Sequence, residues 1–264
     1  MSRIAAKFAE LDEKGEGALI GYLTLGDPDI KTSEELIASL LENVDIMELG
    51  IPFSDPIADG PTIQGAMERA LKAGVNTDIA FEMVSRLRKR FDKPFVFMTY
   101  YNIVLQYGEE KFINRCAEEG VDGVLISDMP IEEAEGTLAL CEKYGVDFVC
   151  LIAPTTGEER IRKIAAKAKG FLYLVALLGV TGAREKLEEE TVRKTKWALR
   201  YAGGVPLAVG FGISKKEHVQ SLIRAGAQGA VVGSAFVELI AERGGDAAAD
   251  LKRLSSELKE GTKK

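Results

Sequence analysis

Histidine, cysteine and tryptophan are scarce in this sequence of 264 residues, which has one, three and one of them. The single histidine, His218, excludes a histidine-rich metal site, and we expect no bound metal. The cysteines are odd in number and show no CxxC spacing, so a disulfide framework is not expected and a reducing compartment is favoured. They are Cys116, Cys141 and Cys150.

Long apolar stretches and an excess of positive charge are also missing. The longest apolar run, Phe171–Val180, is far shorter than the roughly 20 residues of a membrane span, and Met1–Phe8 lacks the apolar core of a signal peptide. We therefore expect a cytoplasmic protein that contacts no membrane. The net charge of -7 argues against a nucleic-acid-binding surface, although backbone N–H groups can still bind a small phosphate ligand.

The chain does contain enough apolar material for a full core. Hydrophobic residues make up 46% of it, as in soluble globular proteins, and its length is ordinary for one α/β barrel of about 250 residues. No Pro/Gly/Ser-rich linker or low-complexity block divides it, so we expect one domain spanning residues 1–264. Lys and Glu gather in residues 252–264, where we expect the end of a surface helix with a frayed tip.

Eight apolar, β-branched runs predict strands. Near-continuous apolar runs of this kind are typical of a parallel sheet that is buried on both faces. The runs are Ala18–Leu23, Val44–Ile51, Phe95–Tyr101, Val121–Ile126, Val146–Ile152, Phe171–Leu177, Pro206–Gly210 and Ala230–Gly233.

Amphipathic segments before and between these runs predict helices, most of which end near a glycine. They are Ile4–Glu13, Ser33–Glu42, Glu109–Glu119, Ile131–Lys143, Glu158–Lys167, Glu190–Tyr201 and Lys215–Arg224. Right-handed crossovers between eight parallel strands predict an α/β fold, a (β/α)8 TIM barrel, with the extra N-terminal helix at its bottom. An open doubly wound sheet is disfavoured because no GxGxxG follows the first strand.

Glycine-rich turns follow the last three predicted strands. Gly210–Ser214 and Gly233–Ala235 follow strands seven and eight, where barrels of this kind often bind phosphate. Glycine lets backbone N–H groups approach an anion, and serine adds a hydroxyl donor. Tight turns are the alternative, but two such turns at the two expected places favour a phosphate site. Gly179–Gly182 after strand six is either a mobile lid or a plain surface loop.

Carboxylates near the end of the second predicted strand are candidates for catalysis. Glu48 lies within an apolar strand, so it must be paired, neutralised or functional. Asp59 lies in the following loop, where it either forms an Asx turn with Gly60 or faces Glu48 across a substrate and divides acid and base roles with it. No lysine lies in a predicted strand, which weakens a Schiff-base mechanism, and His218 is expected on the surface.

Met47–Pro61 closely resembles the signature of tryptophan synthase alpha chains. The resemblance covers nearly the whole chain and implies a lyase of tryptophan biosynthesis, which cleaves indole-3-glycerol phosphate to indole and glyceraldehyde 3-phosphate. Further matching segments are Thr24–Pro28, Tyr100–Asn102, Asp128–Pro130, Gly179–Gly182, Gly210–Ser214 and Gly233–Ser234.

The resemblance also implies roles for single residues. Glu48 would protonate C3 of the indole ring, and Asp59 would contact the indole N–H and stabilise the indolenine cation, so that deprotonation of a glycerol hydroxyl permits retro-aldol cleavage. Substrate-binding residues would be Tyr22, Met98 and Tyr100 around the indole, Tyr173 near Glu48, Thr181 in a lid, and Gly182, Gly212, Gly233 and Ser234 at the phosphate. Tyr22 stands where phenylalanine is common in the family, and Leu177-Leu178 replaces more polar residues.

The resemblance implies a partner as well. It is the tryptophan synthase beta subunit, which carries pyridoxal phosphate, in an alpha2-beta2 tetramer; this chain is expected to bind no cofactor. Segments that meet the beta subunit in relatives contain Pro52, Asp55, Pro56 and Pro130. Indole-3-glycerol-phosphate synthase is an alternative, but its catalytic lysine has no counterpart here. A non-catalytic activator is another, which the presence of both carboxylates argues against.

Overall fold

The computed structural model describes residues 1–175, 184–210 and 212–264. Over these ranges the strands form one parallel sheet in the order β5-β4-β3-β2-β1-β9-β8-β7-β6. Their bounds are β1 (Ala18–Thr24), β2 (Ile46–Gly50), β3 (Phe95–Thr99), β4 (Gly123–Ile126), β5 (Asp147–Phe148), β6 (Cys150–Ile152), β7 (Leu172–Val175), β8 (Leu207–Gly210) and β9 (Gly229–Val232).

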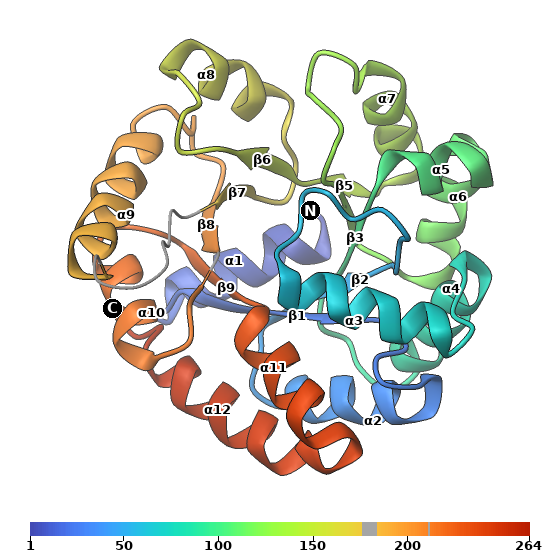
Figure 1. Ribbon diagram of the computed structural model, residues 1–264. Helices are drawn as coiled ribbons and strands as arrows, with labels where there is room; N and C mark the ends of the chain where they lie inside the picture. Colours follow the sequence, from blue (N-terminus) through green and yellow to red (C-terminus); the bar gives the residue numbers. More distant parts are fainter. Residues whose placement is uncertain (176–183, 211) are drawn as a thin grey trace.

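The two ends of that order belong to one chain segment. β5 pairs with β4, β6 pairs with β7, and only Val149 separates β5 from β6. The sheet therefore closes on itself, as the ring of strands in Figure 1 shows. The predicted strand Val146–Ile152 is one strand of the barrel whose halves pair with different neighbours, because strands in a barrel are tilted and staggered. The predicted (β/α)8 barrel is confirmed.

All helices but α1 (Arg3–Glu13) surround the barrel on its outer face (Figure 1). Their bounds are α2 (Ile30–Leu40), α3 (Pro61–Lys72), α4 (Thr77–Arg88), α5 (Tyr101–Tyr107), α6 (Glu109–Glu119), α7 (Glu135–Tyr144), α8 (Glu158–Lys167), α9 (Arg184–Leu199), α10 (Lys216–Arg224), α11 (Ser234–Arg243), the 3-10 helix η1 (Gly244–Ala247) and α12 (Ala248–Glu260). Within the described ranges, each helix is too short or too polar to cross a membrane. Helices α3, α4, α5 and α11 were not predicted from the sequence.

Helix α2 begins three residues before its predicted start at Ser33. Asp29 caps the helix, because its side chain accepts a hydrogen bond of 3.0 Å from the Thr32 N–H. The Ser33 hydroxyl instead accepts a bond of 2.9 Å from the N–H of Gly26, in the loop after β1. A residue of a type that often caps helices therefore anchors a loop here, and the predicted start was wrong. Helices α7 and α9 also begin at other residues than expected.

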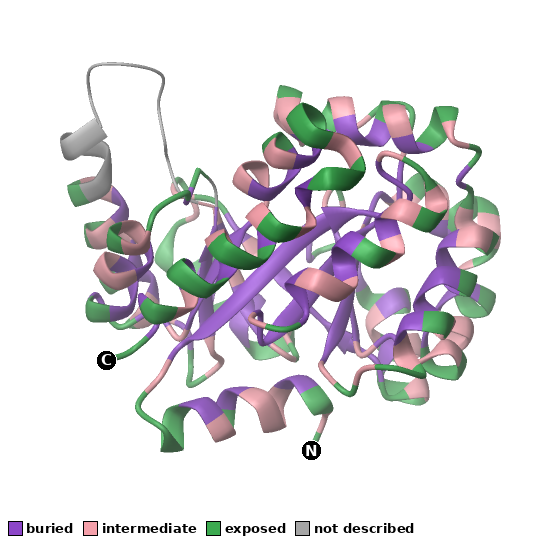
Figure 2. Ribbon diagram, turned by 90° about the horizontal axis from the view of Figure 1, so that it is seen from below, coloured by how far each residue is buried: buried purple, intermediate pink, exposed green. Residues whose placement is uncertain are grey.

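Side chains inside the barrel are arranged in layers above α1. Figure 2 shows α1 lying across one end of the barrel, with the buried strands above it. Ile4 and Phe8 of α1 are buried and pack against interior residues such as Ile20 and Ile46 on strands and Phe171 just before β7. Since α1 precedes β1, it closes the end at which the strands begin, as expected for the extra N-terminal helix. A ligand must enter at the opposite end, where the strands finish.

The C-terminal residues are ordered against the turn between α1 and β1, so the expected frayed tip was wrong. Thr262 is fully buried, and its carbonyl accepts a hydrogen bond of 2.8 Å from the Gly17 N–H. The Lys264 N–H donates to the Gly15 carbonyl at 2.9 Å, and the Lys264 ammonium group pairs with Asp12 at 2.5 Å. The charged composition of the tail indicates that its side chains are exposed, but it gives no sign of these backbone hydrogen bonds.

Removing residues 261–264 should therefore destabilise the protein. Two backbone hydrogen bonds and a buried threonine are lost, so the free energy of unfolding should fall by about 2 kcal/mol, measured by urea unfolding. Lys263→Ala is the control, because it removes only the exposed ion pair with Glu260 and should change the unfolding midpoint little. If the truncated chain unfolds like the intact one, the tail is frayed in solution.

Candidate active site

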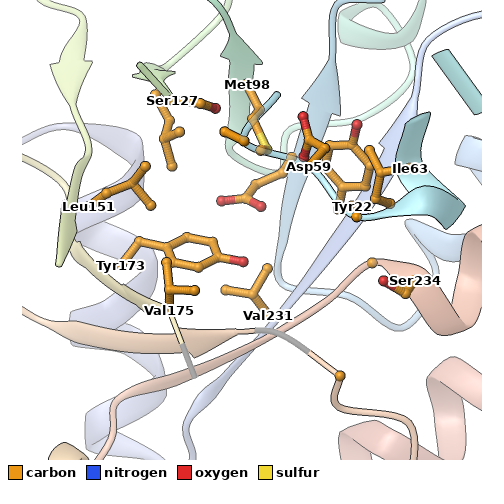
Figure 3. Close-up of a pocket in the computed structure, with 16 residues that line it drawn as sticks. Tyr22, Asp59, Ile63, Met98, Ser127, Leu151, Tyr173, Val175, Val231 and Ser234 are labelled. Atoms are coloured by element: carbon orange, nitrogen blue, oxygen red, sulfur yellow. The ribbon is translucent and has the colours of Figure 1, made fainter. Parts of the chain in front are cut away.

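A pocket lies at the end of the barrel where the strands finish (Figure 3). Its lining is mainly apolar, with a few polar groups that converge on the same space, and such a lining suits a small-molecule ligand. Leu125 and Val231 of the lining belong to the buried interior layer, and the other strand residues lie two or four positions beyond that layer, because alternate residues of a strand face the same side. The lining consists of Tyr22, Glu48, Met98, Leu125, Leu151, Tyr173, Val175 and Val231 from strands, and Ala58, Asp59, Gly60, Ile63, Ser127, Gly212, Gly233 and Ser234 from the segments that follow.

Glu48 is a buried carboxyl group without a partner. It lies on β2 and is only 1% exposed, and among the described residues neither of its oxygens has a hydrogen-bond partner. Burial raises the pKa of Glu48 from 4.5 to about 8, because the charged form loses its hydration. The sequence left three alternatives for Glu48, namely that it is paired, neutralised or functional. The structure shows no salt bridge to Glu48 among the described residues. The group is neutralised, and it holds a proton that it can donate at neutral pH.

Asp59, in the loop between β2 and α3, is held by Tyr100. The Tyr100 hydroxyl donates a hydrogen bond of 2.6 Å to Asp59 Oδ2 and accepts one of 3.1 Å from the N–H of Ala58. Burial raises the pKa of Asp59, while the bond from Tyr100 lowers it. The Asp59 carboxylate thus bonds to Tyr100, in a distant segment of the barrel, instead of closing an Asx turn with Gly60. Asp59 is half-buried and is oriented at the mouth of the pocket.

Two tyrosines fill the space beside Glu48, and two glycines make room for them. Tyr22 of β1 is the register partner of Glu48, and its hydroxyl hydrogen-bonds to Thr24 Oγ1 at 3.1 Å. The hydroxyl that phenylalanine would lack is therefore paired within the barrel. A Cβ atom at Gly50 would lie 2.2 Å from the Tyr22 hydroxyl, and one at Gly210 would lie 2.3 Å from that of Tyr173. Neither position accepts a side chain while the adjacent ring stays in place.

The segments after β8 and β9 form a side of the pocket suited to an anion. Gly212 has a φ of +68°, a conformation that favours glycine. Gly233 precedes α11, and Ser234 is its first residue. The first turn of a helix presents backbone N–H groups and the positive end of the helix dipole, which together favour a phosphate group.

The structure brings most of the expected site residues together. The pocket is lined by eight of them, namely Tyr22, Glu48, Asp59, Met98, Tyr173, Gly212, Gly233 and Ser234. Tyr100 is buried behind Asp59 rather than in the lining. Thr181 and Gly182 lie outside the described residues, as does Leu177-Leu178. The described lining contains no lysine, as expected from the lysine-free strands, and no group of His, Cys, Asp or Glu in the described ranges is arranged to hold a metal ion.

The four expected interface residues differ in exposure. Pro52 is buried, which leaves it little surface for another chain, whereas Asp55 is exposed and Pro56 and Pro130 are half-buried. Ile57, next to Pro56, is 86% exposed. Such a large apolar side chain on a loop beside the pocket was not singled out from the sequence.

Sequence reasoning missed the apolar wall of the pocket and one hydroxyl group. Leu125, Leu151 and Val231 face inward by the same two-residue alternation that places Glu48, so that alternation was a usable signal once the strands were assigned. Ser127 directly follows β4, so its place at a strand end was also a signal. Ile63 lies on the unpredicted helix α3, and the sequence offered no clue to it.

A closed parallel barrel, with a neutral buried carboxyl group and a second carboxylate over an apolar pocket, defines a (β/α)8-barrel protein equipped for acid–base chemistry on a small ligand. Comparison with known proteins identifies the family to which this barrel belongs. A family model described as "Tryptophan synthase alpha chain" matches residues 8–264. The chain belongs to the tryptophan synthase alpha chain family.

Individual relatives agree with this assignment. The tryptophan synthase alpha chain of Methanosarcina barkeri is 48% identical over 263 residues, which cover 99% of this chain and 98% of that protein. That of Aquifex aeolicus is 47% identical over 263 residues, covering 99% of each. A solved structure of the tryptophan synthase α2β2 complex from Pyrococcus furiosus matches with a TM-score of 0.88 and 43% identity, covering 92% of this chain and 98% of the other.

The raised pKa of Glu48 makes the stability of the protein depend on pH. The folded state keeps this proton up to about pH 8, while the unfolded chain loses it near pH 4.5, so Glu48 destabilises the fold increasingly as pH rises between these values. Glu48→Gln removes this dependence. Relative to the wild type, the variant should therefore gain roughly 4 kcal/mol of unfolding free energy between pH 5 and pH 9, measured by denaturant unfolding at both values.

The control is Glu13→Gln, at an exposed position at the end of α1. It should follow the wild-type pH dependence. Parallel stability curves for Glu48→Gln and the wild type would show that Glu48 ionises as an ordinary carboxylate.

Proposed function

We propose that this protein is a lyase that cleaves indole-3-glycerol phosphate to indole and glyceraldehyde 3-phosphate, as the alpha subunit of a tryptophan synthase in tryptophan biosynthesis. The observation that carries the proposal is Glu48, a protonated carboxyl group that faces an apolar pocket and accepts no hydrogen bond from the described residues. Family membership supports the same reaction. An acid buried in this way suits protonation of a carbon atom of an apolar ring.

Two carboxyl groups then divide the chemistry. Glu48 donates its proton to C3 of the indole ring, and Asp59 accepts a hydrogen bond from the indole N–H and stabilises the positive charge on the ring. The Glu48 carboxylate next takes the proton of the hydroxyl on the carbon attached to C3. The bond between that carbon and C3 breaks, its electrons return to the ring, and the hydroxyl becomes the aldehyde. One proton is added and one removed, so the reaction is balanced without oxidation or reduction.

The other lining residues bind the substrate in this proposal. Gly212, Gly233 and Ser234 hold the phosphate at the start of α11. Tyr22 and Met98 contact the indole, Tyr100 orients Asp59, and Tyr173 lies near Glu48. Thr181 and Gly182 are assigned to a lid and to the phosphate by resemblance to the family alone.

The proposal includes the beta subunit as partner, in an alpha2-beta2 tetramer. The Pyrococcus furiosus relative was solved as an α2β2 complex, and Asp55, Pro56 and Pro130 offer surface beside the pocket mouth; Pro52 would act by shaping this loop. Pyridoxal phosphate is expected in the beta subunit and no cofactor in this chain, since proton transfers suffice for the cleavage. We further propose that residues 1–264 form a single domain and that the protein works in the cytoplasm.

The test is indole release from indole-3-glycerol phosphate, with and without a beta subunit. The wild type should release indole, and the partner should raise the rate sharply. Glu48→Gln should lower kcat by a factor of about 100 to 10,000, as expected for loss of a general acid, while Glu13→Gln should act like the wild type. If no indole forms under either condition, the protein is not this lyase. If Glu48→Gln releases indole as fast as the wild type, Glu48 is not the acid, and a subunit that only activates its partner would give that same result.

Tyr100→Phe tests how Asp59 is held. The variant removes the donor to Asp59 and the acceptor for the Ala58 N–H, so kcat/KM should fall about tenfold or more, the usual loss for a hydrogen bond to a charged group. The matched control is Tyr144→Phe, whose hydroxyl bonds to Glu110 at 2.9 Å on the surface, and whose activity should stay within about twofold of the wild type. Equal kcat/KM for both variants would mean that Asp59 needs no support from Tyr100.

A further inference from the structure

Ser127 carries a buried hydroxyl group that makes no hydrogen bond to any described residue. In the described part of the chain, buried side-chain atoms without a hydrogen bond are confined to Glu48, Thr99 and Ser127. Of these residues, Glu48 and Ser127 line the pocket. The carboxyl of Glu48 has a use in the proposed reaction, but the hydroxyl of Ser127 has none. A hydroxyl buried without a partner is unfavourable, so its place marks where a bound molecule would supply one.

The backbone fixes Ser127 at the apolar end of the pocket. Its N–H donates a hydrogen bond of 2.9 Å to the Thr99 carbonyl, which ties the residue to the end of β3. Met98 and Leu125 are register partners on β3 and β4 just below it, and both line the pocket. In Figure 3, Ser127 and Leu151 lie on one side of the pocket and Ser234 lies on the other. Ser127 is therefore a polar group in an apolar wall, far from the anion side.

This arrangement orients the substrate, provided that the proposed function holds. With the phosphate at Ser234 and the indole N–H at Asp59, the six-membered ring of the indole extends toward Met98, Leu125 and Ser127. That ring has only C–H groups in the unsubstituted substrate. It displaces water from the pocket and leaves the Ser127 hydroxyl without a hydrogen bond.

We propose that Ser127 is a specificity-determining residue for the six-membered ring of the substrate. Its hydroxyl hydrogen-bonds to a polar substituent on that ring, so the enzyme also cleaves indole-3-glycerol phosphates that carry a ring hydroxyl. The bond that breaks is the same, and the products are a hydroxyindole and glyceraldehyde 3-phosphate. The substituent takes no part in the chemistry and acts only by replacing the displaced water.

Ser127→Ala should shift the two kinds of substrate in opposite directions. A ring hydroxyl loses its partner in the variant, whereas an unsubstituted ring no longer buries an unpaired hydroxyl. The experiment measures kcat/KM for the unsubstituted substrate and for the four forms hydroxylated at ring positions 4 to 7. For the form whose hydroxyl reaches Ser127, the variant should lose about five- to tenfold, and for the unsubstituted substrate kcat/KM should hold or rise. A merely structural role would move all five substrates together.

Ser234→Ala is the matched control. It acts on the phosphate that the five substrates share, so it should lower kcat/KM for each by the same factor. Ser127→Ala should unfold at the wild-type temperature or slightly above it, because the removed hydroxyl has no hydrogen bond to the described residues. The inference is overturned if the ratio of hydroxylated to unsubstituted kcat/KM is the same in Ser127→Ala as in the wild type for each form.

Failure of the proposed function would be visible separately, as absence of indole from the unsubstituted substrate. In that case, equilibrium dialysis of indole and the four hydroxyindoles with both proteins decides the inference without turnover. Weaker binding of one hydroxyindole to Ser127→Ala, with indole binding unchanged or tighter, supports the assigned contact. Identical affinity ratios for the two proteins overturn it.

Discussion

The two-residue repeat of a β-strand governs where each side chain of this barrel points. Ile46 faces inward into a core that α1 seals from below, so Glu48, two residues later, must also face inward. At that height the surroundings are apolar on the sides and open only toward the mouth. The strand thereby forces a carboxyl group into a place where it has no hydrogen-bond partner, and its neutral state at pH 7 follows from that position alone.

Glu48 and Asp59 are both carboxyl groups, but different effects act on their pKa values, because their burial and hydrogen bonding differ. Glu48 belongs to a strand and accepts no hydrogen bond from the described residues, so desolvation determines its proton affinity. Asp59 belongs to a loop, and Tyr100 donates to it, which counteracts the effect of burial. A pair of groups whose environments push their pKa values apart is the usual basis for separate acid and charge-stabilising roles. In this barrel, burial acts alone on the pKa of Glu48, whereas for Asp59 burial is the larger effect and the bond from Tyr100 opposes it.

The fold was predictable from sequence because burial of a parallel sheet on both faces leaves long apolar runs, which need no knowledge of contacts to recognise. Glu48 was predictable for the same reason, as a charge within such a run. The support of Asp59 by Tyr100 was not, because it joins residues 41 positions apart through one hydrogen bond. The anchoring of Thr262 beside Gly17 was hidden likewise, since backbone pairing leaves no mark on composition. The proposed role of Ser127 could be recognised only when two facts were known: that it lies at the end of a strand, and that its hydroxyl makes no hydrogen bond to the described residues.

The close fit of Gly50 against Tyr22, and of Gly210 against Tyr173, has a consequence for how such a barrel changes over evolutionary time. Each pair joins neighbouring strands. In each, only glycine fits, because the tyrosine ring occupies the volume that a side chain at the glycine position would need. At Gly50, a larger residue becomes tolerable only after Tyr22 has been replaced by a smaller one. At Gly210, Tyr173 must be replaced and the backbone must also shift from Val231, whose Cβ would lie 2.9 Å from the added atom. The order of substitutions is thus constrained at both pairs of positions.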